Sequence, residues 1–340
     1  RMRSVPRCSR AEVISRPGWS SGNALSIIIS PNTSSLLYFG DFMNYGYAHA
    51  NTAHLTVGWS GVNPAPPTSP VATAATNITT TSFSANWGAV AAATSYRLDA
   101  ATDANFTSMV SGYNDLNVGN VATYSVSGLT PGITYYYRVR GVNGGGTSLS
   151  SNTISQITVP PAPAAASAAN MTTTSLTANW GATTGAASYR LDAATDAGFT
   201  AFVSGYNNLN VSDISQSVTG LTPGITYYYR VRAVNAGGTS ANSNTVSQIT
   251  VTSAPTASAA TSVLDVSFTA NWSAPTGAAS YQLDVATDSN FINFVSGYSS
   301  KSVSGTSSSV TGLSYGTIYY YRLRAVNAGG VSVSSNTITL

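Results

Sequence analysis

The sequence predicts an all-β chain of three tandem antiparallel β-sandwiches, preceded by a short β-rich N-terminal segment. Trp87, Trp180 and Trp272 stand 93 and 92 residues apart, and similar sequence surrounds each of them. Within each copy, apolar and polar residues alternate, as over Phe83–Trp87, which is typical of a strand with one buried face. The copies contain no sustained apolar stripe of 3.6-residue period, so nothing in them favours a helix.

The repeat also defines the domain boundaries. A period of about 92 residues is that of a whole domain rather than of a solenoid unit. Pro-rich joints separate the copies, because proline cannot continue a sheet ladder. Turn signals such as Thr130-Pro131-Gly132 divide each copy into about seven strands. We therefore predict an N-terminal segment over 1–67 and repeats over 68–160, 161–252 and 253–340.

Composition excludes several function classes. Charged residues are only 7% of the chain, and after residue 67 eight Arg and Lys301 balance nine Asp. A neutral array lacks the basic surface that nucleic acids require. The single cysteine, Cys8, excludes an internal disulfide and a multi-cysteine metal site. The longest apolar run, Leu25–Ile29, is too short to span a membrane. We expect no nucleic-acid partner and no membrane span.

No catalytic constellation is visible in the sequence. The two histidines, His49 and His54, have no nearby Cys or Glu, and no Gly-x-Ser-x-Gly motif accompanies them. The aspartates of the repeats recur at equivalent positions; those at 103, 196 and 288 are interpreted as turn-forming residues. We predict that the chain is not an enzyme and has no catalytic residue, metal site or cofactor.

These repeats resemble the fibronectin type III family. The resemblance rests on the tryptophan of the second strand, a tyrosine in the third, and the stretch Leu129–Asn143, which recurs at Leu221–Asn235 and Leu313–Asn327. It covers roughly 270 residues and implies immunoglobulin-like sandwiches. The motifs at Val110–Tyr113 and Thr102–Phe106 resemble modules repeated in large secreted bacterial proteins. That likeness implies an extracellular or cell-surface location.

The resemblance also implies structural roles for individual residues. The repeated tryptophans would fill the core, and the tyrosines six residues after the Leu that opens each recurring stretch would lock the crossover before the long strand by hydroxyl bonds to upstream backbone. Arg97 and Asp99 would face Arg138 and Arg140 on the wet outer face. The structural set is Trp87, Trp180, Trp272, Tyr135, Tyr227 and Tyr319.

Two groups of tyrosines are candidates for a ligand or partner surface. One group lies beside arginines on the long strand, and the other lies in an Asn/Ser-rich loop. Aromatic faces beside amides can hold sugars, whereas cross-strand packing and cation–π contact would explain the same residues without a ligand. These residues are Tyr136, Tyr228, Tyr320, Tyr113, Tyr206 and Tyr298.

The N-terminal segment does not match the repeat. A segment of this size with two or three strands is marginal as an independent domain. It is either the tail of a larger domain or an arm that completes its fold on a neighbouring subunit by strand addition. Its aromatic residues form a candidate assembly segment: Tyr38, Phe39, Phe42, Tyr45, Tyr47 and Trp59.

Together these features predict a non-catalytic extracellular structural or adhesive protein, with a filament or sheath subunit as the specific hypothesis. Its partners would be other copies of itself or an extracellular or cell-surface polymer, with glycans as a further candidate. One alternative is a spacer array within a secreted polysaccharide-degrading enzyme. Another is a carbohydrate-binding surface protein.

Overall fold

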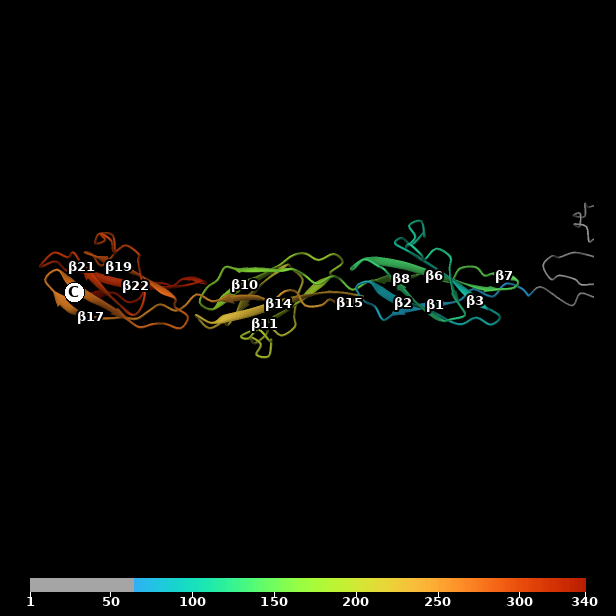
Figure 1. Ribbon diagram of the computed structural model, residues 1–340, viewed down its shortest axis with the longest axis horizontal. Helices are drawn as coiled ribbons and strands as arrows, with labels where there is room; N and C mark the ends of the chain where they lie inside the picture. Colours follow the sequence, from blue (N-terminus) through green and yellow to red (C-terminus); the bar gives the residue numbers. More distant parts are fainter. Residues whose placement is uncertain (1–63) are drawn as a thin grey trace, which may run out of the picture. The chain divides into compact units, whose positions relative to one another are not determined.

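The computed structural model describes residues 64–340, and all regular structure in this range is β-strand (Figure 1). The predicted all-β fold is therefore confirmed. No helix among these residues has the length and apolar character needed to cross a membrane. The predicted N-terminal assembly segment, both histidines and Cys8 lie outside the described residues.

Three sets of eight strands follow one another along the chain. Repeat 1 contains β1 (Ala72–Thr76), β2 (Ser82–Trp87), β3 (Ser95–Ala101), β4 (Leu116–Gly119), β5 (Thr123–Ser127), β6 (Thr134–Asn143), β7 (Gly146–Thr147) and β8 (Ile154–Ile157). Repeat 2 contains β9 (Ala165–Ala169), β10 (Ser175–Trp180), β11 (Ser188–Ala194), β12 (Leu209–Val211), β13 (Ser215–Thr219), β14 (Thr226–Asn235), β15 (Gly238–Thr239) and β16 (Val246–Ile249). Repeat 3 contains β17 (Ala257–Leu264), β18 (Ser267–Trp272), β19 (Ser280–Ala286), β20 (Lys301–Val303), β21 (Ser307–Thr311), β22 (Tyr320–Asn327), β23 (Gly330–Val331) and β24 (Ile338–Thr339).

Each repeat is made of two antiparallel sheets. In repeat 1 one sheet has the order β1-β2-β5 and the other the order β4-β3-β6-β7, and β8 also pairs with β6. Repeats 2 and 3 keep the same order. Since β7 and β8 pair with different parts of β6, they are two pieces of one interrupted edge strand.

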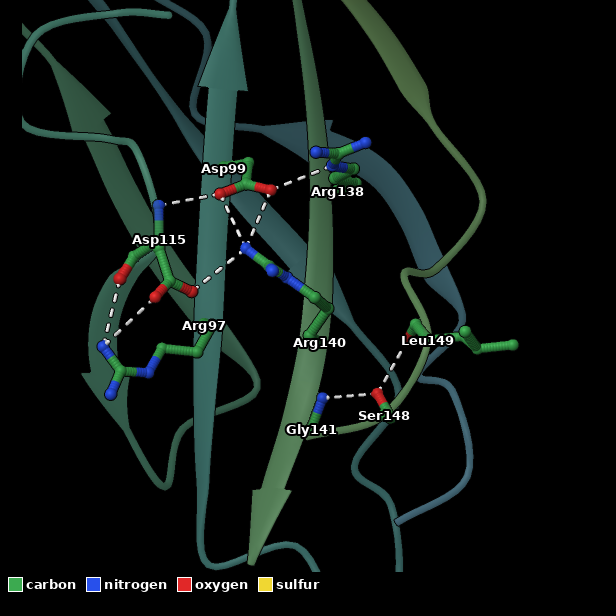
Figure 2. Close-up of polar contacts among 8 residues, drawn as sticks. All are labelled: Arg97, Asp99, Asp115, Arg138, Arg140, Gly141, Ser148 and Leu149. Carbon is green, nitrogen blue, oxygen red and sulfur yellow. Dashed lines mark hydrogen bonds and ion pairs between the residues drawn. The ribbon is translucent and has the colours of Figure 1, made fainter. Parts of the chain in front are cut away.

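Serine side chains bridge this interruption. The Gly141 N–H, which has no ladder partner there, donates to the Ser148 hydroxyl at 2.9 Å, and that hydroxyl donates to the Leu149 carbonyl at 2.7 Å (Figure 2). Ser151 accepts from the Val139 N–H in the same way, at 3.0 Å. The serines thus satisfy backbone groups that would otherwise be buried without a partner.

The core lies between the two sheets and consists of the inward residues of each alternating strand. The Trp87 and Tyr96 rings come from opposite sheets and have centroids 5.7 Å apart, as do those of Phe83 and Tyr137. The Tyr137 hydroxyl donates to the Thr73 carbonyl on the facing sheet. Burial of this hydroxyl raises its pKa above that of free tyrosine. Tyr137 therefore joins the two sheets as well as filling the space between them.

Candidate functional site

The most concentrated chemistry in each repeat is a cluster of charges on the outer face of the β3-β6 sheet (Figure 2). Asp99 pairs directly with Arg138 and lies two register positions from Arg140, which pairs with Arg97. Arg138 Nε donates to Asp99 Oδ2 at 2.9 Å, and Arg140 Nη2 lies 3.0 Å from each carboxylate oxygen. The N–H of Asp115 also donates to Asp99 Oδ1, at 2.8 Å.

The environment of this cluster differs from the expected wet surface. Asp99, Asp192 and Asp284 are each only 1% exposed. The cause is the covering loop, which we define as residues 102–115 and its equivalents 195–208 and 287–300. In repeat 1 the Phe106 ring lies 4.1 Å from the Arg138 guanidinium, and the equivalent distance in the other repeats is 4.0 Å. On the outer face of each repeat, the covering loop therefore buries an aspartate and partly covers the arginine groups that bond to it.

An aspartate at the start of the covering loop fixes its shape. The Asp103 carboxylate accepts hydrogen bonds from the N–H groups of Asn105, Thr107 and Ser108. The bond from Ser108 foremost, at 2.6 Å, holds the pKa of Asp103 below that of free aspartate. These bonds hold Phe106 at φ 59°, a conformation that bulky residues rarely adopt. The sequence analysis interpreted this aspartate as a turn-forming residue, and its carboxylate stabilises the turn through these bonds.

The geometry of Asp99 leaves little scope for catalysis. Both carboxylate oxygens accept bonds from arginine or backbone, and the covering loop keeps out solvent. A general acid or base must reach the proton that it transfers, and this carboxylate cannot. Within residues 64–340, no three or more His, Cys, Asp or Glu side chains are grouped so that they could hold a metal ion.

The candidate tyrosines of the covering loop hold that loop in place. The Tyr113 hydroxyl accepts from the Ser127 N–H on β5 at 2.8 Å, and Tyr206 and Tyr298 accept from Thr219 and Thr311 at 3.0 and 2.9 Å. Tyr298 is only 6% exposed. These side chains connect the loop to the opposite sheet, and Tyr113 and Tyr206 remain partly exposed.

The second tyrosine group remains half-exposed on the outer face. Tyr136 pairs with Ala101, which in turn bridges to Met109. The equivalent rows in repeats 2 and 3 end in Phe202 and Phe294, with Tyr228 and Tyr320 at the other end. In repeats 2 and 3, an alanine therefore lies between two aromatic residues, one on the long strand and one in the covering loop. A ligand for these rows remains a prediction.

The residues expected in the core and corner lie as follows. Trp87, Trp180 and Trp272 are 3–4% exposed, and the indole N–H of each has no hydrogen-bond partner among residues 64–340. The hydroxyl of Tyr135 accepts from the Thr130 N–H at 2.8 Å. Tyr227 and Tyr319 accept from Thr222 and Ser314 at the same distance.

Contacts between successive repeats involve residues to which the sequence analysis assigned no function. Asn235 Nδ2 donates to the Thr158 carbonyl at 2.9 Å, and Asn327 Nδ2 donates to the Thr250 carbonyl at 2.9 Å. Asn143 makes the corresponding bond to the Ala65 carbonyl, which precedes repeat 1. The sequence carried a signal for these contact residues, because the asparagines recur at 92-residue intervals, each followed closely by a glycine pair.

Glycines bring the backbones together at the same junctions. A Cβ on Gly132 would lie 2.2 Å from the Thr184 carbonyl oxygen, and one on Gly224 would lie 1.9 Å from the Thr276 oxygen. The turn before the long strand of one repeat therefore touches the second turn of the next repeat. Only glycine permits so close an approach.

The model of the fibronectin type III domain matches this chain three times, over residues 65–157, 161–249 and 253–340. Three proteins are similar over parts of the chain. The Kelch domain-containing protein SSO1033 of Saccharolobus solfataricus is 35% identical over 136 residues, which is 38% of this chain and 18% of that protein. Chitinase A1 of Niallia circulans is 30% identical over 204 residues, 54% of this chain and 26% of that protein. Exoglucanase B of Cellulomonas fimi is 28% identical over 252 residues, 67% of this chain and 22% of that protein.

The chain thus spans about a quarter or less of each of these relatives. The three family matches together cover most of the sequence. The two-sheet topology, the corner tyrosines and the core tryptophans fit the same family. The chain belongs to the fibronectin type III family, of which it contains three domains in tandem.

Proposed function

We propose that the three domains form a non-catalytic, extracellular spacer array that holds neighbouring parts of a secreted, polysaccharide-acting protein at a defined separation. The observation that carries this proposal is the bonded junction between repeats. Independent domains would need only a linker between them. Here, at both junctions, an asparagine side chain bonds to a carbonyl of the preceding repeat, and a turn of each repeat contacts a turn of the other.

The junction hydrogen bonds are protected from water. Thr158 and Thr250, which supply the accepting carbonyls, are 0% exposed. Their hydroxyls donate to Thr130 and Thr222 in the preceding turns, at 2.8 and 2.7 Å. Each junction threonine therefore connects the last turns of one repeat to the asparagine of the next. Buried bonds of this kind favour one relative orientation, because breaking them leaves buried polar groups unsatisfied.

The relatives support the polysaccharide context. Two of them are named as a chitinase and an exoglucanase, and this chain matches only part of each. The aromatic rows ending in Phe202 and Phe294 offer a surface that sugars could contact, in accord with the glycan partner expected from the sequence. The filament or sheath hypothesis places its subunit contacts in residues 1–67, which lie outside the described residues, whereas the bonded junctions support a spacer.

Distance measurement between repeats tests the spacer role. Nitroxide labels at Leu149→Cys and Val333→Cys, which are 83% and 76% exposed, would be introduced into the full chain with Cys8→Ser. Double electron–electron resonance should give one narrow distance distribution. Asn235→Ala with Asn327→Ala should broaden it, since both junctions lose their side-chain bonds.

Asn143→Ala provides the matched control. It removes the same type of bond, but its acceptor is Ala65 rather than an atom of a neighbouring repeat, so the distribution should stay narrow. A wild-type distribution as broad as that of the double variant would refute the spacer function.

A further inference from the structure

The outward tyrosines of the long strands belong to rows of side chains on the outer face of repeats 2 and 3. In repeat 2, Tyr228 on β14 pairs with Ala194 on β11, which bridges to Phe202 in the covering loop. Ser247 on β16 pairs with Tyr228 from the other side and adds an exposed hydroxyl group to the row. We call each such set of four residues an aromatic row. The members in repeat 3 are Thr339, Tyr320, Ala286 and Phe294.

The rings of the aromatic rows are accessible to a ligand. In repeat 2 both rings are partly exposed although another repeat follows, so this exposure is a property of the repeat itself. The Tyr228 hydroxyl has no protein hydrogen bond within residues 64–340, whereas the hydroxyls of its neighbours Tyr227 and Tyr229 both bond to backbone. Phenylalanine would fill the same space as Tyr228, so packing within the repeat does not explain this hydroxyl.

The aromatic rows consist of uncharged residues, and the charges next to them on the long strand are already paired. Arg230 is the next outward residue after Tyr228 on β14. Its Nε donates to Asp192 at 3.0 Å, and its guanidinium lies 4.0 Å from the Phe199 ring. Repeat 3 has the equivalent contacts. Aromatic rings edged by hydroxyl groups and by paired charges are complementary to a neutral ligand rather than to an acidic one.

We infer that the aromatic rows bind a linear, neutral polysaccharide, whose sugar rings lie on the tyrosine and the phenylalanine of a row. A pyranose presents an apolar face of C–H groups that packs on an aromatic ring, and its hydroxyls can bond to the tyrosine and to the serine or threonine of the row. The two aromatic residues start from backbone segments two strand spacings apart, about 10 Å, which suits two sugars of a linear chain better than one. The choice of a polysaccharide rests on the proposed function, whereas the neutrality of the ligand follows from the row itself.

Repeat 1 provides a comparison within the chain, because Met109 takes the place of the phenylalanine. Tyr136 and Ala101 keep the same register there. Methionine retains apolar volume but lacks the flat face on which a sugar ring packs. Repeat 1 should therefore bind the polysaccharide more weakly than repeats 2 and 3, and it shows that the fold accommodates methionine at this position.

Amide NMR spectra of the full isotope-labelled chain test the inference by titration with three hexasaccharides. Cellohexaose and N-acetylchitohexaose are neutral, and hexagalacturonate is acidic. At least one neutral hexasaccharide should shift the amide signals of β14, β22 and their covering loops, with a dissociation constant on the order of 1 mM for so open a site. Phe202→Met with Phe294→Met should weaken this binding about fivefold, because the flat ring is lost while the apolar volume stays.

Tyr228→Leu with Tyr320→Leu is a second variant, which removes the aromatic ring from the long strands instead of the loops and should also weaken binding. Leu149→Met with Ile214→Met is the matched control, since both side chains are apolar and exposed but lie outside the aromatic rows. It should leave the dissociation constant unchanged.

Three results would overturn the inference: no shift in the rows with any hexasaccharide, a response to hexagalacturonate alone, or binding that neither row variant weakens. None of these results bears on the spacer function, because the distances between repeats are measured without a ligand. A broad distance distribution with intact glycan binding would instead remove the spacer and keep the site.

Discussion

At the scale of single residues, the aspartate under each covering loop has the largest structural consequence. Asp192 is 1% exposed and receives bonds from Arg230 and Arg232 at 3.0–3.1 Å. Removing this aspartate would leave two arginines, whose side chains are 24% and 25% exposed, without their carboxylate partner. Solvent-exposed ion pairs, which the alternating pattern of the strand predicts at these positions, would contribute far less to stability. The difference arises because a loop distant in sequence covers the strand.

Asp192→Ala should destabilise repeat 2 by about 1.5–3 kcal/mol, because the charged hydrogen bonds from Arg230 and Arg232 are lost while the arginines keep partial contact with water. Amide hydrogen exchange followed by mass spectrometry resolves each repeat separately and measures this loss. Asp213→Ala, at an exposed aspartate, should change protection by less than about 0.5 kcal/mol. Equal protection in the two variants would contradict the structural role of Asp192.

Acid should weaken the covering loops through their turn aspartates. N–H bonds, from Thr200 foremost, hold the pKa of Asp196 below that of the unfolded chain, and Asp103 and Asp288 are lowered similarly. A depressed folded-state pKa contributes stability above the unfolded pKa and loses it as the pH falls through the folded pKa. The urea midpoint should therefore fall between about pH 5 and pH 2.

The triple variant Asp103→Asn, Asp196→Asn, Asp288→Asn should reduce this acid dependence, because amides do not titrate in the range. Asp213→Asn serves as the comparison and should keep the wild-type slope. An unchanged slope in the triple variant would assign the acid sensitivity to other carboxylates.

At the scale of the element, the tyrosine corner orders the turn that leads into each long strand. The Tyr227 hydroxyl accepts from the Thr222 N–H five residues earlier, across the turn that also contacts the next repeat. Its neighbour Tyr228 points to the outer face, and its hydroxyl has no protein hydrogen bond within residues 64–340. Adjacent tyrosines thus differ in role because successive side chains of a strand face opposite sides.

Tyr227→Phe should cost repeat 2 about 1–3 kcal/mol, because the Thr222 N–H loses its acceptor while the ring is retained. Tyr228→Phe should be nearly neutral. Hydrogen exchange in β14 measures both. If the two substitutions have the same effect, the hydroxyl of the corner tyrosine is not what stabilises the turn.

Much of each element was predictable from alternation. The strand Ser82–Trp87 buries Phe83, Ala85 and Trp87, the inward set of its pattern. The burial of Asp99 was not predictable, because its outward position on the strand says nothing of the loop that folds over it. Nor did local pattern reveal the bonds of Tyr113, since Ser127 lies on the other sheet.

At the scale of the whole described molecule, the junctions depend on glycines that both adopt a positive φ and allow the next repeat's backbone to approach closely. Gly224 has φ +69° and approaches the Thr276 carbonyl of the next repeat, whereas Gly316 has φ +72° and no atom of the described residues within 4 Å of its Cβ position. These two positions separate backbone strain from junction packing. The repeat count was predictable from the tryptophan period, but no period in the sequence says which atoms of neighbouring copies meet.

Gly224→Ala should disturb the junction between repeats 2 and 3, because the added methyl group would overlap the Thr276 carbonyl oxygen. Labels at Ala241→Cys and Val333→Cys should then give a broader or shifted distance distribution. Gly316→Ala carries the same left-handed strain of about 1–2 kcal/mol but should leave the distribution unchanged. Identical distributions in both variants would exclude the glycine contact as an orienting feature.

The near-identity of the repeats has a consequence for how the chain reaches its native state. The long strands β6 and β14 differ only at Gly141 and Ala233, and β3 and β11 have the same sequence. During refolding, β3 therefore meets two nearly equivalent partners, one of them in the wrong repeat. Such exchange between neighbours is a characteristic misfolding route of tandem arrays. Synthesis from the N-terminus favours the correct choice, because β6 follows β3 before β14 has been made.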